Sequence, residues 1–209
     1  MYLRDHFRTP EVDVQTMLNE IRAGTLVTVD PETRRPEASF LPWAFVNGDT
    51  LTSHIGIINP QARHEGEALV ILMGKDAYVS EEWMKPGSVP SWNYETIHLY
   101  GRLTIHTDPE WIIRSFEDVM QRFSRKTHAD YSREYLEQQT RASVGVEFTI
   151  TEIQAKSKLS QNRAESEVRT IIENLEPTCP HLAQRMREVS LPHIADRQAR
   201  IDQARSTIQ

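Results

Sequence analysis

A succession of strand-type segments between residues 25 and 153 is the feature that most constrains the fold of this chain. Asn47-Gly48-Asp49 is a strong hairpin signal between two of them, because asparagine and glycine tolerate positive φ. Residues 76–80 either continue the fourth segment or pair back on it. Strands joined by such short turns predict an antiparallel sheet. The six segments, rich in β-branched, aromatic or alternating apolar residues, are 25–29, 37–46, 50–54, 68–73, 92–106 and 144–153.

Helical patterns lie before, between and after these strands. Thr9 and Pro10 mark the start of a helix that Gly24 stops, and Asp108 caps a helix running to about residue 125. This order of elements predicts an α+β fold, in which helices surround a closed or nearly closed antiparallel barrel of six strands. Further helices are predicted over residues 130–140, 166–175 and 181–206, the last interrupted at Leu191-Pro192.

Composition argues against several classes of protein. The net charge is −6 and no run of Lys and Arg forms a cationic stripe, so DNA binding by this chain alone is not indicated. Cys179 is the single cysteine, which excludes an internal disulfide and a cysteine-based metal site. The eight histidines show no metal-binding spacing, and no phosphate-loop or nucleophile-elbow motif is present. The first residues do not resemble a signal peptide and no stretch approaches ~18 apolar residues, so we expect a cytoplasmic protein without a membrane span.

Two short segments far apart in the sequence carry the residues typical of a polar ligand site. They are residues 89–94 and 158–163, which mix amides, hydroxyls and aromatic or cationic side chains. In the first, Trp92 can stack on a flat ligand and Asn93 can read its edge, or the aromatic residues can belong to the core of a strand. The second is either part of the site or a turn in which Asn162 caps the next helix.

A third candidate lies where the strand at residues 50–54 ends and a helical turn begins. Ser53, His54 and Ile55 precede Asn59-Pro60-Gln61 there. Exposed N–H groups at the start of a helix favour an anion, so this segment is a candidate seat for a phosphate. The alternative is a simple connection in which Asn59 caps the turn ahead of Pro60.

Taken together, these segments resemble the PaiB family, the FMN-binding split-barrel proteins described as negative transcriptional regulators. Ser157 and Met84 stand where family members tend to have an aromatic residue and a tyrosine. The matching pieces are Met1-Tyr2 with His6-Phe7, residues 24–27, Leu41-Pro42, His54 with Asn59-Pro60-Gln61, residues 77–80 with Trp83, residues 89–94 with His98 and Tyr100-Gly101, and residues 158–163.

The resemblance implies a six-stranded split β-barrel over residues 1–175, a C-terminal helical extension over residues 176–209, and a homodimer with FMN at its interface. It places Ser53, His54, Ile55, Asn59 and Gln61 near the phosphate and ribityl chain. It places the backbone of Ser39, Leu41 and Pro42 at the isoalloxazine edge. The residues that it implies to close the pocket are Trp92, Asn93, Lys158, Gln161 and Asn162.

The resemblance implies a PaiB-type transcriptional regulator, and two other functions stay open. One is an FMN-dependent oxidoreductase that uses a reduced nicotinamide, which is an analogy at the level of the fold. The other is a relative that binds haem or no cofactor, which the residues at positions 84 and 157 motivate. The sequence does not decide whether the protein is an enzyme.

Overall fold

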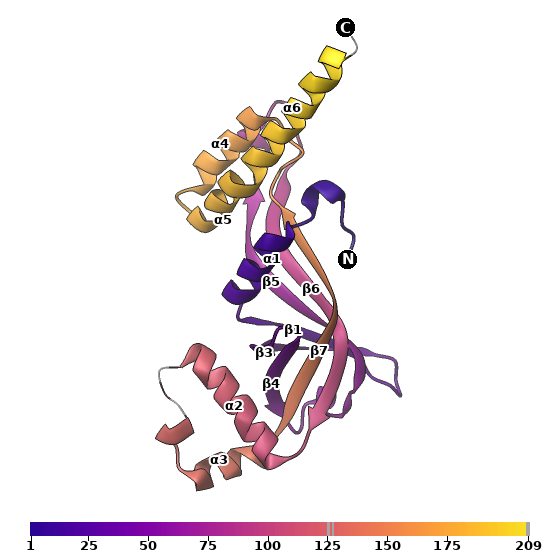
Figure 1. Ribbon diagram of the computed structural model, residues 1–209, viewed down its shortest axis with the longest axis vertical. Helices are drawn as coiled ribbons and strands as arrows, with labels where there is room; N and C mark the ends of the chain where they lie inside the picture. Colours follow the sequence, from indigo (N-terminus) through magenta and orange to yellow (C-terminus); the bar gives the residue numbers. More distant parts are fainter. Residues whose placement is uncertain (125, 127, 208–209) are drawn as a thin grey trace. The chain divides into compact units, whose positions relative to one another are not determined.

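The computed structural model describes residues 1–124, 126 and 128–207, and these form two compact units (Figure 1). The sheet unit comprises Gln15–Leu72 and Ile97–Gln154. The helical unit comprises Met1–Val14, Met73–Thr96 and Ala155–Gln209. Helix α1 (Glu11–Glu20) and the strands β5 (Gly66–Val79), β6 (Ser91–His106) and β7 (Ser143–Lys158) each have residues in both units.

The strands form one mixed-length sheet with the order β2-β1-β5-β6-β7-β4-β3. The remaining strands are β1 (Ala23–Val29), β2 (Pro36–Pro42), β3 (Ala44–Asn47) and β4 (Thr50–Gly56). The pairs β1–β2, β1–β5, β3–β4 and β4–β7 are antiparallel, and their registers place Leu26 opposite Ser39 and His54 opposite Gly145. The predicted α+β class with an antiparallel sheet is therefore confirmed.

The predicted number of six strands is wrong, because the segment at residues 37–46 forms two strands that meet at Trp43. β2 pairs with β1 at one edge of the sheet, and β3 pairs with β4 at the other edge. The Trp43 side chain is 1% exposed, its backbone N–H donates to the carbonyl of Arg22 at 3.0 Å, and its indole donates to the carbonyl of Gly24 at 3.3 Å. Because the chain turns at Trp43, this one segment provides both edge strands, β2 and β3, and the sheet has seven strands in an open order.

Residues 68–73 and 76–79 belong to the single strand β5, which ends one residue before the predicted end at residue 80, and β7 continues five residues beyond the predicted end at residue 153. The hairpin between β3 and β4 turns at Gly48-Asp49, one residue later than the Asn-Gly pair suggests. Burial alternates along β1, whose residues from Ala23 to Thr28 switch between half-buried and buried. This alternation is typical of a strand with one face on a core.

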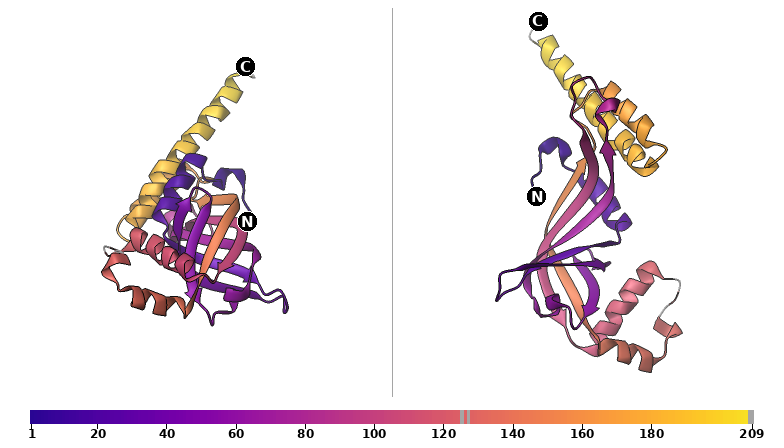
Figure 2. Two further views of the ribbon diagram at one scale, coloured as in Figure 1. Left: turned by 60° about the horizontal axis from the view of Figure 1, so that its bottom comes forward. Right: turned by 180° about the vertical axis from the view of Figure 1, so that it is seen from behind.

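Two helices lie in the sheet unit beside the strands, the first packed against β4 and the second against the first (Figures 1 and 2). They are α2 (Pro109–Phe123) and α3 (Arg133–Thr140), with the 3₁₀ turn η4 (His128–Asp130) between them. The Asp108 side chain accepts from the N–H of Trp111 at 2.9 Å, which is the expected N-cap of α2. Helix α2 ends at Phe123, and the predicted end near residue 125 lies outside the described residues. A further 3₁₀ turn, η2 (Pro60–Arg63), follows β4.

In the helical unit, α4 (Glu165–Leu175), α5 (Pro180–Arg185), the π turn η5 (Met186–Ser190) and α6 (Leu191–Thr207) follow the last strand (Figure 2). The π turn precedes Pro192, which has no N–H to donate to the preceding turn and accounts for the interruption predicted there. The unit also contains the 3₁₀ turns η1 (Asp5–Phe7) and η3 (Glu81–Trp83). Its core cluster consists of Val79, Leu159, Val168, Ile171, Ile172, Leu175, Leu182, Ala183, Met186 and Ile194.

Because α4 shares this core with the later helices, the proposed boundary between residues 175 and 176 falls inside one packed cluster. The division of the chain into a barrel and a C-terminal extension stays a prediction. No helix in the described part of the chain is long and apolar enough to span a membrane.

Candidate functional site

The predicted site residues fall into two sets, one in each unit. The sheet unit contains Ser39, Leu41, Pro42, Ser53, His54, Ile55, Asn59 and Gln61. The helical unit contains Trp92, Asn93, Lys158, Gln161 and Asn162.

Asn59 and Gln61 connect the turn η2 to the strands β1 and β2. The Asn59 carboxamide accepts from the N–H of Gln61 at 2.9 Å and donates to the Ser39 hydroxyl at 2.9 Å, so the capping interpretation of Asn59 is what the structure shows. Gln61 is 1% exposed, and its amide lies within 3.3 Å of the carbonyls of Leu26 and Glu37. Its Oε1 has no hydrogen-bond partner among the described residues. Gln61 therefore stabilises the strand-turn junction and keeps one buried acceptor available.

Adjacent residues of β4 point to opposite faces, which separates Ser53 from His54. Ser53 is fully buried and its hydroxyl has no hydrogen-bond partner in the described part of the chain, while Ile55 on the same face is 4% exposed. On the other face, the Thr52 hydroxyl donates to Asp118 of α2 at 3.0 Å. Leu41 is buried in the core and Pro42 ends β2. One ligand can thus contact the side chains of only part of this predicted set.

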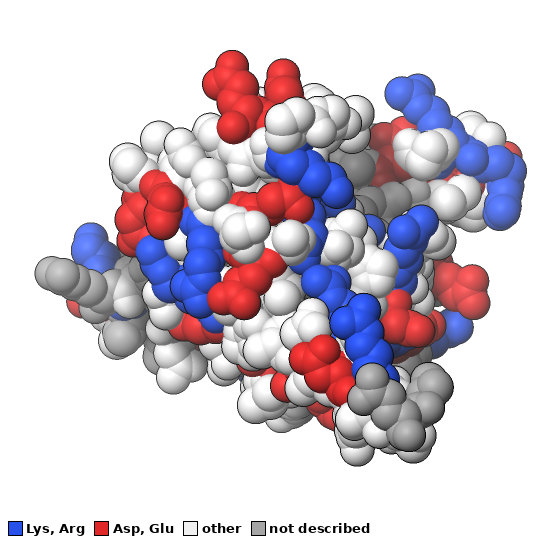
Figure 3. Space-filling view, turned by 90° about the horizontal axis from the view of Figure 1, so that it is seen from above, with Lys and Arg blue, Asp and Glu red and all other residues white. Residues whose placement is uncertain are grey.

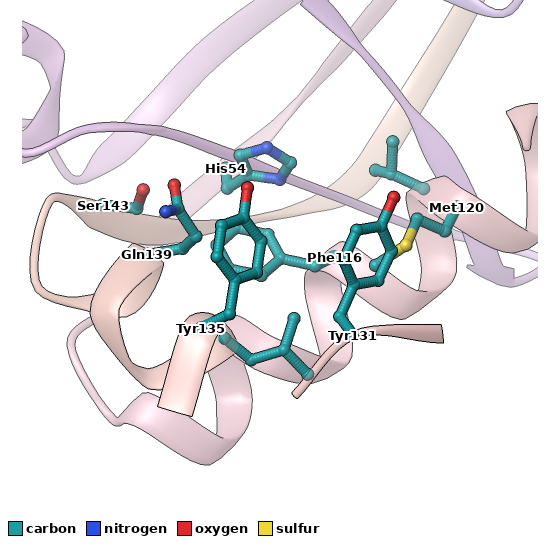
Figure 4. Close-up of a pocket in the computed structure, with 9 residues that line it drawn as sticks. His54, Phe116, Met120, Tyr131, Tyr135, Gln139 and Ser143 are labelled. Atoms are coloured by element: carbon teal, nitrogen blue, oxygen red, sulfur yellow. The ribbon is translucent and has the colours of Figure 1, made fainter. Parts of the chain in front are cut away.

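The imidazole of His54 lines a pocket between β4, α2 and α3 that sequence reasoning missed (Figure 4). Its ring meets the Phe116 ring edge-on, with centroids 4.5 Å apart at 85°. Burial lowers the pKa of His54, because a less polar environment disfavours the charged imidazolium. The cavity has a volume of about 270 Å³ and is lined by His54, Phe116, Val119, Met120, Tyr131, Tyr135, Leu136, Gln139 and Ser143.

A second pocket lies in the helical unit and contains several of the residues predicted to hold a ligand. Its volume is about 530 Å³, and its described lining combines four cationic side chains with four aromatic rings and no carboxylate. We call it the cationic pocket. Its lining residues are Tyr2, Arg4, Phe7, Ser91, Trp92, Tyr94, Lys156, Lys158, Ser160, Asn162 and Arg163.

Lys158 is the central cation of this pocket. Its ammonium donates to the Ser91 hydroxyl at 2.7 Å and to the carbonyl of Trp92, and it lies 5.9 Å from the centre of the Tyr94 ring. Burial lowers the pKa of Lys158, and the positive charges of Lys156 and Arg163 lower it further. The hydroxyl, the carbonyl and the ring that contact this ammonium are all neutral, so an anion in the pocket would provide a counter-charge.

Of the other predicted residues of this unit, two form hydrogen bonds behind the cationic pocket and two line it. Gln161 folds back, accepting from the N–H of Leu159 at 2.8 Å and donating to the carbonyl of Ser157 at 2.5 Å. Asn93 is fully buried and accepts from the Ser160 hydroxyl at 3.0 Å. These bonds hold Ser160 at a φ of 68°, the left-handed region that non-glycine residues rarely adopt.

Trp92 and Asn162 line the pocket directly. The Trp92 side chain is 49% exposed, and its indole donates to Asp76 at 2.8 Å. Asn162 does not cap the following helix, because the N-cap of α4 is Ala164, whose N–H donates to Glu167 at 3.3 Å. A half-exposed indole face and an amide not used as a cap are both suited to contact a flat polar ligand.

No group of three or more His, Cys, Asp or Glu side chains is close enough to hold a metal ion among the residues that the structure describes.

Comparison with known proteins identifies a family. Residues 1–152 match the family model described as "Putative FMN-binding domain". The chain is 30% identical over 206 residues to the protease synthase and sporulation protein PAI 2 of Bacillus subtilis, covering 90% of this chain and 97% of that protein.

Two solved structures have a similar fold. The conserved hypothetical protein Rv2991 of Mycobacterium tuberculosis has a TM-score of 0.57 at 18% identity, over 79% of this chain and 95% of that one. The FAD and haem binding protein of Mycobacterium smegmatis has a TM-score of 0.58 at 18% identity, over 79% of this chain and 80% of that one. At these identities the likeness concerns the fold alone.

Proposed function

Since this chain belongs to the PaiB-like family of FMN-binding domains, with FMN as the cofactor of the family, we propose that the chain binds FMN in the cationic pocket and acts as a regulator. FMN combines a phosphate dianion with a flat three-ring system whose edge carries hydrogen-bonding groups. The observation that supports the proposal is the lining of the cationic pocket, where Lys158, Lys156, Arg4 and Arg163 stand among aromatic rings.

The residues of the pocket divide naturally between the two ends of such a ligand. Lys158 would hold the phosphate, since a cation that donates to neutral groups favours an anion. Arg163, which also lies 3.6 Å from Glu167, would add a second positive charge. Trp92 would stack on the ring system and Asn162 would bond its edge. Asn93 and Gln161 position this wall through their bonds to Ser160 and Leu159. When bound, FMN supplies one- and two-electron redox chemistry.

The sheet unit offers further groups that fit the ligand. The buried hydroxyl of Ser53 and the Oε1 of Gln61 lack partners among the described residues, which is uncommon for buried polar atoms. We propose a homodimer with the flavin at its interface, in which the set formed by Ser39, Leu41, Pro42, Ser53, Ile55, Asn59 and Gln61 in one subunit completes the pocket of the other. His54 would join this set only through its backbone, because its ring faces the pocket beside α2.

Titration with FMN and with riboflavin tests the cationic pocket, because riboflavin lacks the phosphate. We expect Lys158→Gln to weaken FMN binding roughly ten- to a hundredfold, since a charge-assisted hydrogen bond is lost. Riboflavin affinity should change little. Flavin fluorescence quenching measures both.

Lys75→Gln is the matched control, because Lys75 is an exposed lysine of the same unit that does not line the pocket. Equal losses for FMN and riboflavin in Lys158→Gln, or no loss, would contradict the phosphate assignment. A haem spectrum of the purified protein would favour the haem-binding alternative, and bleaching of bound flavin by a reduced nicotinamide would favour the oxidoreductase.

The regulatory role is proposed from the Bacillus relative, whose name associates that protein with protease synthesis and sporulation. Figure 3 shows acidic and basic side chains interspersed on the face in view, without a stripe of one sign. Contact of this face with DNA would therefore neutralise few phosphates. We expect the purified dimer to shift promoter DNA only at low salt, with a shallow dependence on salt concentration. The absence of a shift at 50 mM salt, with and without FMN, would contradict regulation through direct DNA contact.

A further inference from the structure

The pocket beside β4 differs in chemistry from the cationic pocket. None of its nine described lining residues is Asp, Glu, Lys or Arg. Its walls are apolar or aromatic, and the polar groups are an imidazole, two phenols, an amide and a hydroxyl, from His54, Tyr131, Tyr135, Gln139 and Ser143. Such a lining offers little to a phosphate or a carboxylate, because it carries no counter-charge itself and the neighbouring Lys126 ammonium lies against the Tyr131 ring, 5.8 Å from its centre.

His54 provides the strongest sign of a ligand in this pocket. Its Nδ1 is buried and has no hydrogen-bond partner among the described residues. The ring is held by its edge-on contact with Phe116, so it cannot turn to another partner without losing that packing. A buried ring nitrogen without a partner destabilises the fold unless another molecule satisfies it.

The opposite wall is a pair of stacked phenols. The rings of Tyr131 and Tyr135 have centroids 5.6 Å apart and lie within 18° of parallel. Figure 4 shows both hydroxyl groups directed toward the side of the pocket where His54 lies, with the Gln139 amide beside the imidazole. Tyr135 is 47% exposed although it is aromatic. The pocket is therefore open to solvent at its tyrosine side and polar at its inner end.

We propose that this pocket binds a neutral, planar aromatic molecule of one or two rings that carries a hydrogen-bonding group at its edge. The edge group would bond His54 Nδ1 and the Gln139 amide, and the ring would lie against Phe116 and the tyrosine pair. A volume of about 270 Å³ is just below the ~300–1,000 Å³ typical of sites for larger ligands, which fits one or two rings. The site is independent of the flavin site proposed above.

A pair of probes that differ mainly in charge tests this proposal. 2-Naphthol is neutral at pH 7, whereas 2-naphthoate has the same ring system and a carboxylate. We expect 2-naphthol to bind in calorimetric titration and 2-naphthoate to bind at least about tenfold more weakly, because no cation lines the described pocket. Similar affinity for the two probes, or no binding of 2-naphthol at millimolar concentration, would overturn the proposal.

Variants then locate the binding. His54→Phe preserves an aromatic ring against Phe116 and removes Nδ1, so it should weaken 2-naphthol binding about tenfold. Tyr78→Phe removes a phenol that donates to Glu81 in the helical unit, and it should leave the affinity unchanged. 2-Naphthol should bind the original chain with the same affinity in the presence and in the absence of FMN. Unchanged 2-naphthol affinity in His54→Phe, or competition between FMN and 2-naphthol, would overturn the assignment of a separate site.

Discussion

Replacing Arg185 by methionine should lower the free energy of unfolding by about 3 kcal/mol, because it leaves a carboxylate buried without its counter-charge. The guanidinium of Arg185 lies 3.2 Å from Glu95, 3.0 Å from Glu188 and 3.4 Å from Asp13. The Glu95 side chain is only 4% exposed, so water cannot replace the lost cation. Burial acts to lower the pKa of Arg185, but the hydrogen bonds and charges of Glu95 and Glu188 raise it overall, so the guanidinium stays charged. Urea unfolding followed by circular dichroism measures the loss.

A double-mutant cycle separates the buried charge from lost packing. If the charge on Glu95 causes the loss, Arg185→Met combined with Glu95→Gln should be more stable than Arg185→Met alone. Arg187→Met is the matched control, since Arg187 pairs with Glu176 at the surface with 40% and 48% of the two side chains exposed. It should change the stability by no more than about 0.5 kcal/mol. A double variant as unstable as the single one would show that the charge on Glu95 is not responsible.

Ser157, which departs from the pattern that the resemblance implies at this position, belongs to this network. Ser157 is fully buried, and its hydroxyl lies 2.8 Å from Glu95 and 2.8 Å from Thr9. The serine hydroxyl thus donates a hydrogen bond to a buried carboxylate on β6, 62 residues earlier in the sequence. The sequence could show that the position was unusual, but not which distant side chain it contacts.

Helices and strands were predictable where a long alternating pattern or a local capping residue marked them. The long strand predicted at residues 92–106 is β6, one residue longer, and Asp108 and Pro109 correctly begin α2. The corner at Trp43 was not predicted, although Pro42 interrupts the strand character of residues 37–46. Only the buried indole and its bond to Gly24 show that the chain changes its pairing partner there.

The sequence identified residues of the ligand-binding type, but it showed only in part which of them line a pocket. It identified Lys158, Trp92 and Asn162 as ligand-type residues, and they line one pocket. It could not distinguish them from Gln161 and Asn93, whose amides are occupied by the loop itself. It missed the pocket beside β4, because two tyrosines four residues apart on the helix predicted over residues 130–140 look like an ordinary surface pair. These tyrosines line a pocket together with His54, which lies 77 residues before the first of them in the sequence.

The substitution Gly101→Ala should have an equally large effect, although it adds a single methyl group. A Cβ on Gly101 would lie 2.1 Å from the carbonyl oxygen of Thr149 and within 2.9 Å of two ring carbons of Phe148. Neither neighbour can yield easily, because the oxygen belongs to the backbone of β7 and the Phe148 ring is fully buried. Overpacking of this kind costs about 3 kcal/mol, and for a chain of this length that lowers the thermal midpoint by roughly 6–12 °C.

Intrinsic preference predicts the opposite sign, which makes the experiment decisive. Alanine in place of glycine in a strand removes conformational freedom from the unfolded chain and should stabilise by about 0.5–1 kcal/mol where space exists. Gly56→Ala provides that comparison, since a Cβ at the end of β4 would meet only the carbonyl of Ala142, at 3.9 Å. If Gly101→Ala melts at the same temperature as Gly56→Ala, β6 and β7 are not packed as closely as described. If it melts well below, the close approach of these two strands, rather than any ligand, is what requires glycine at this position.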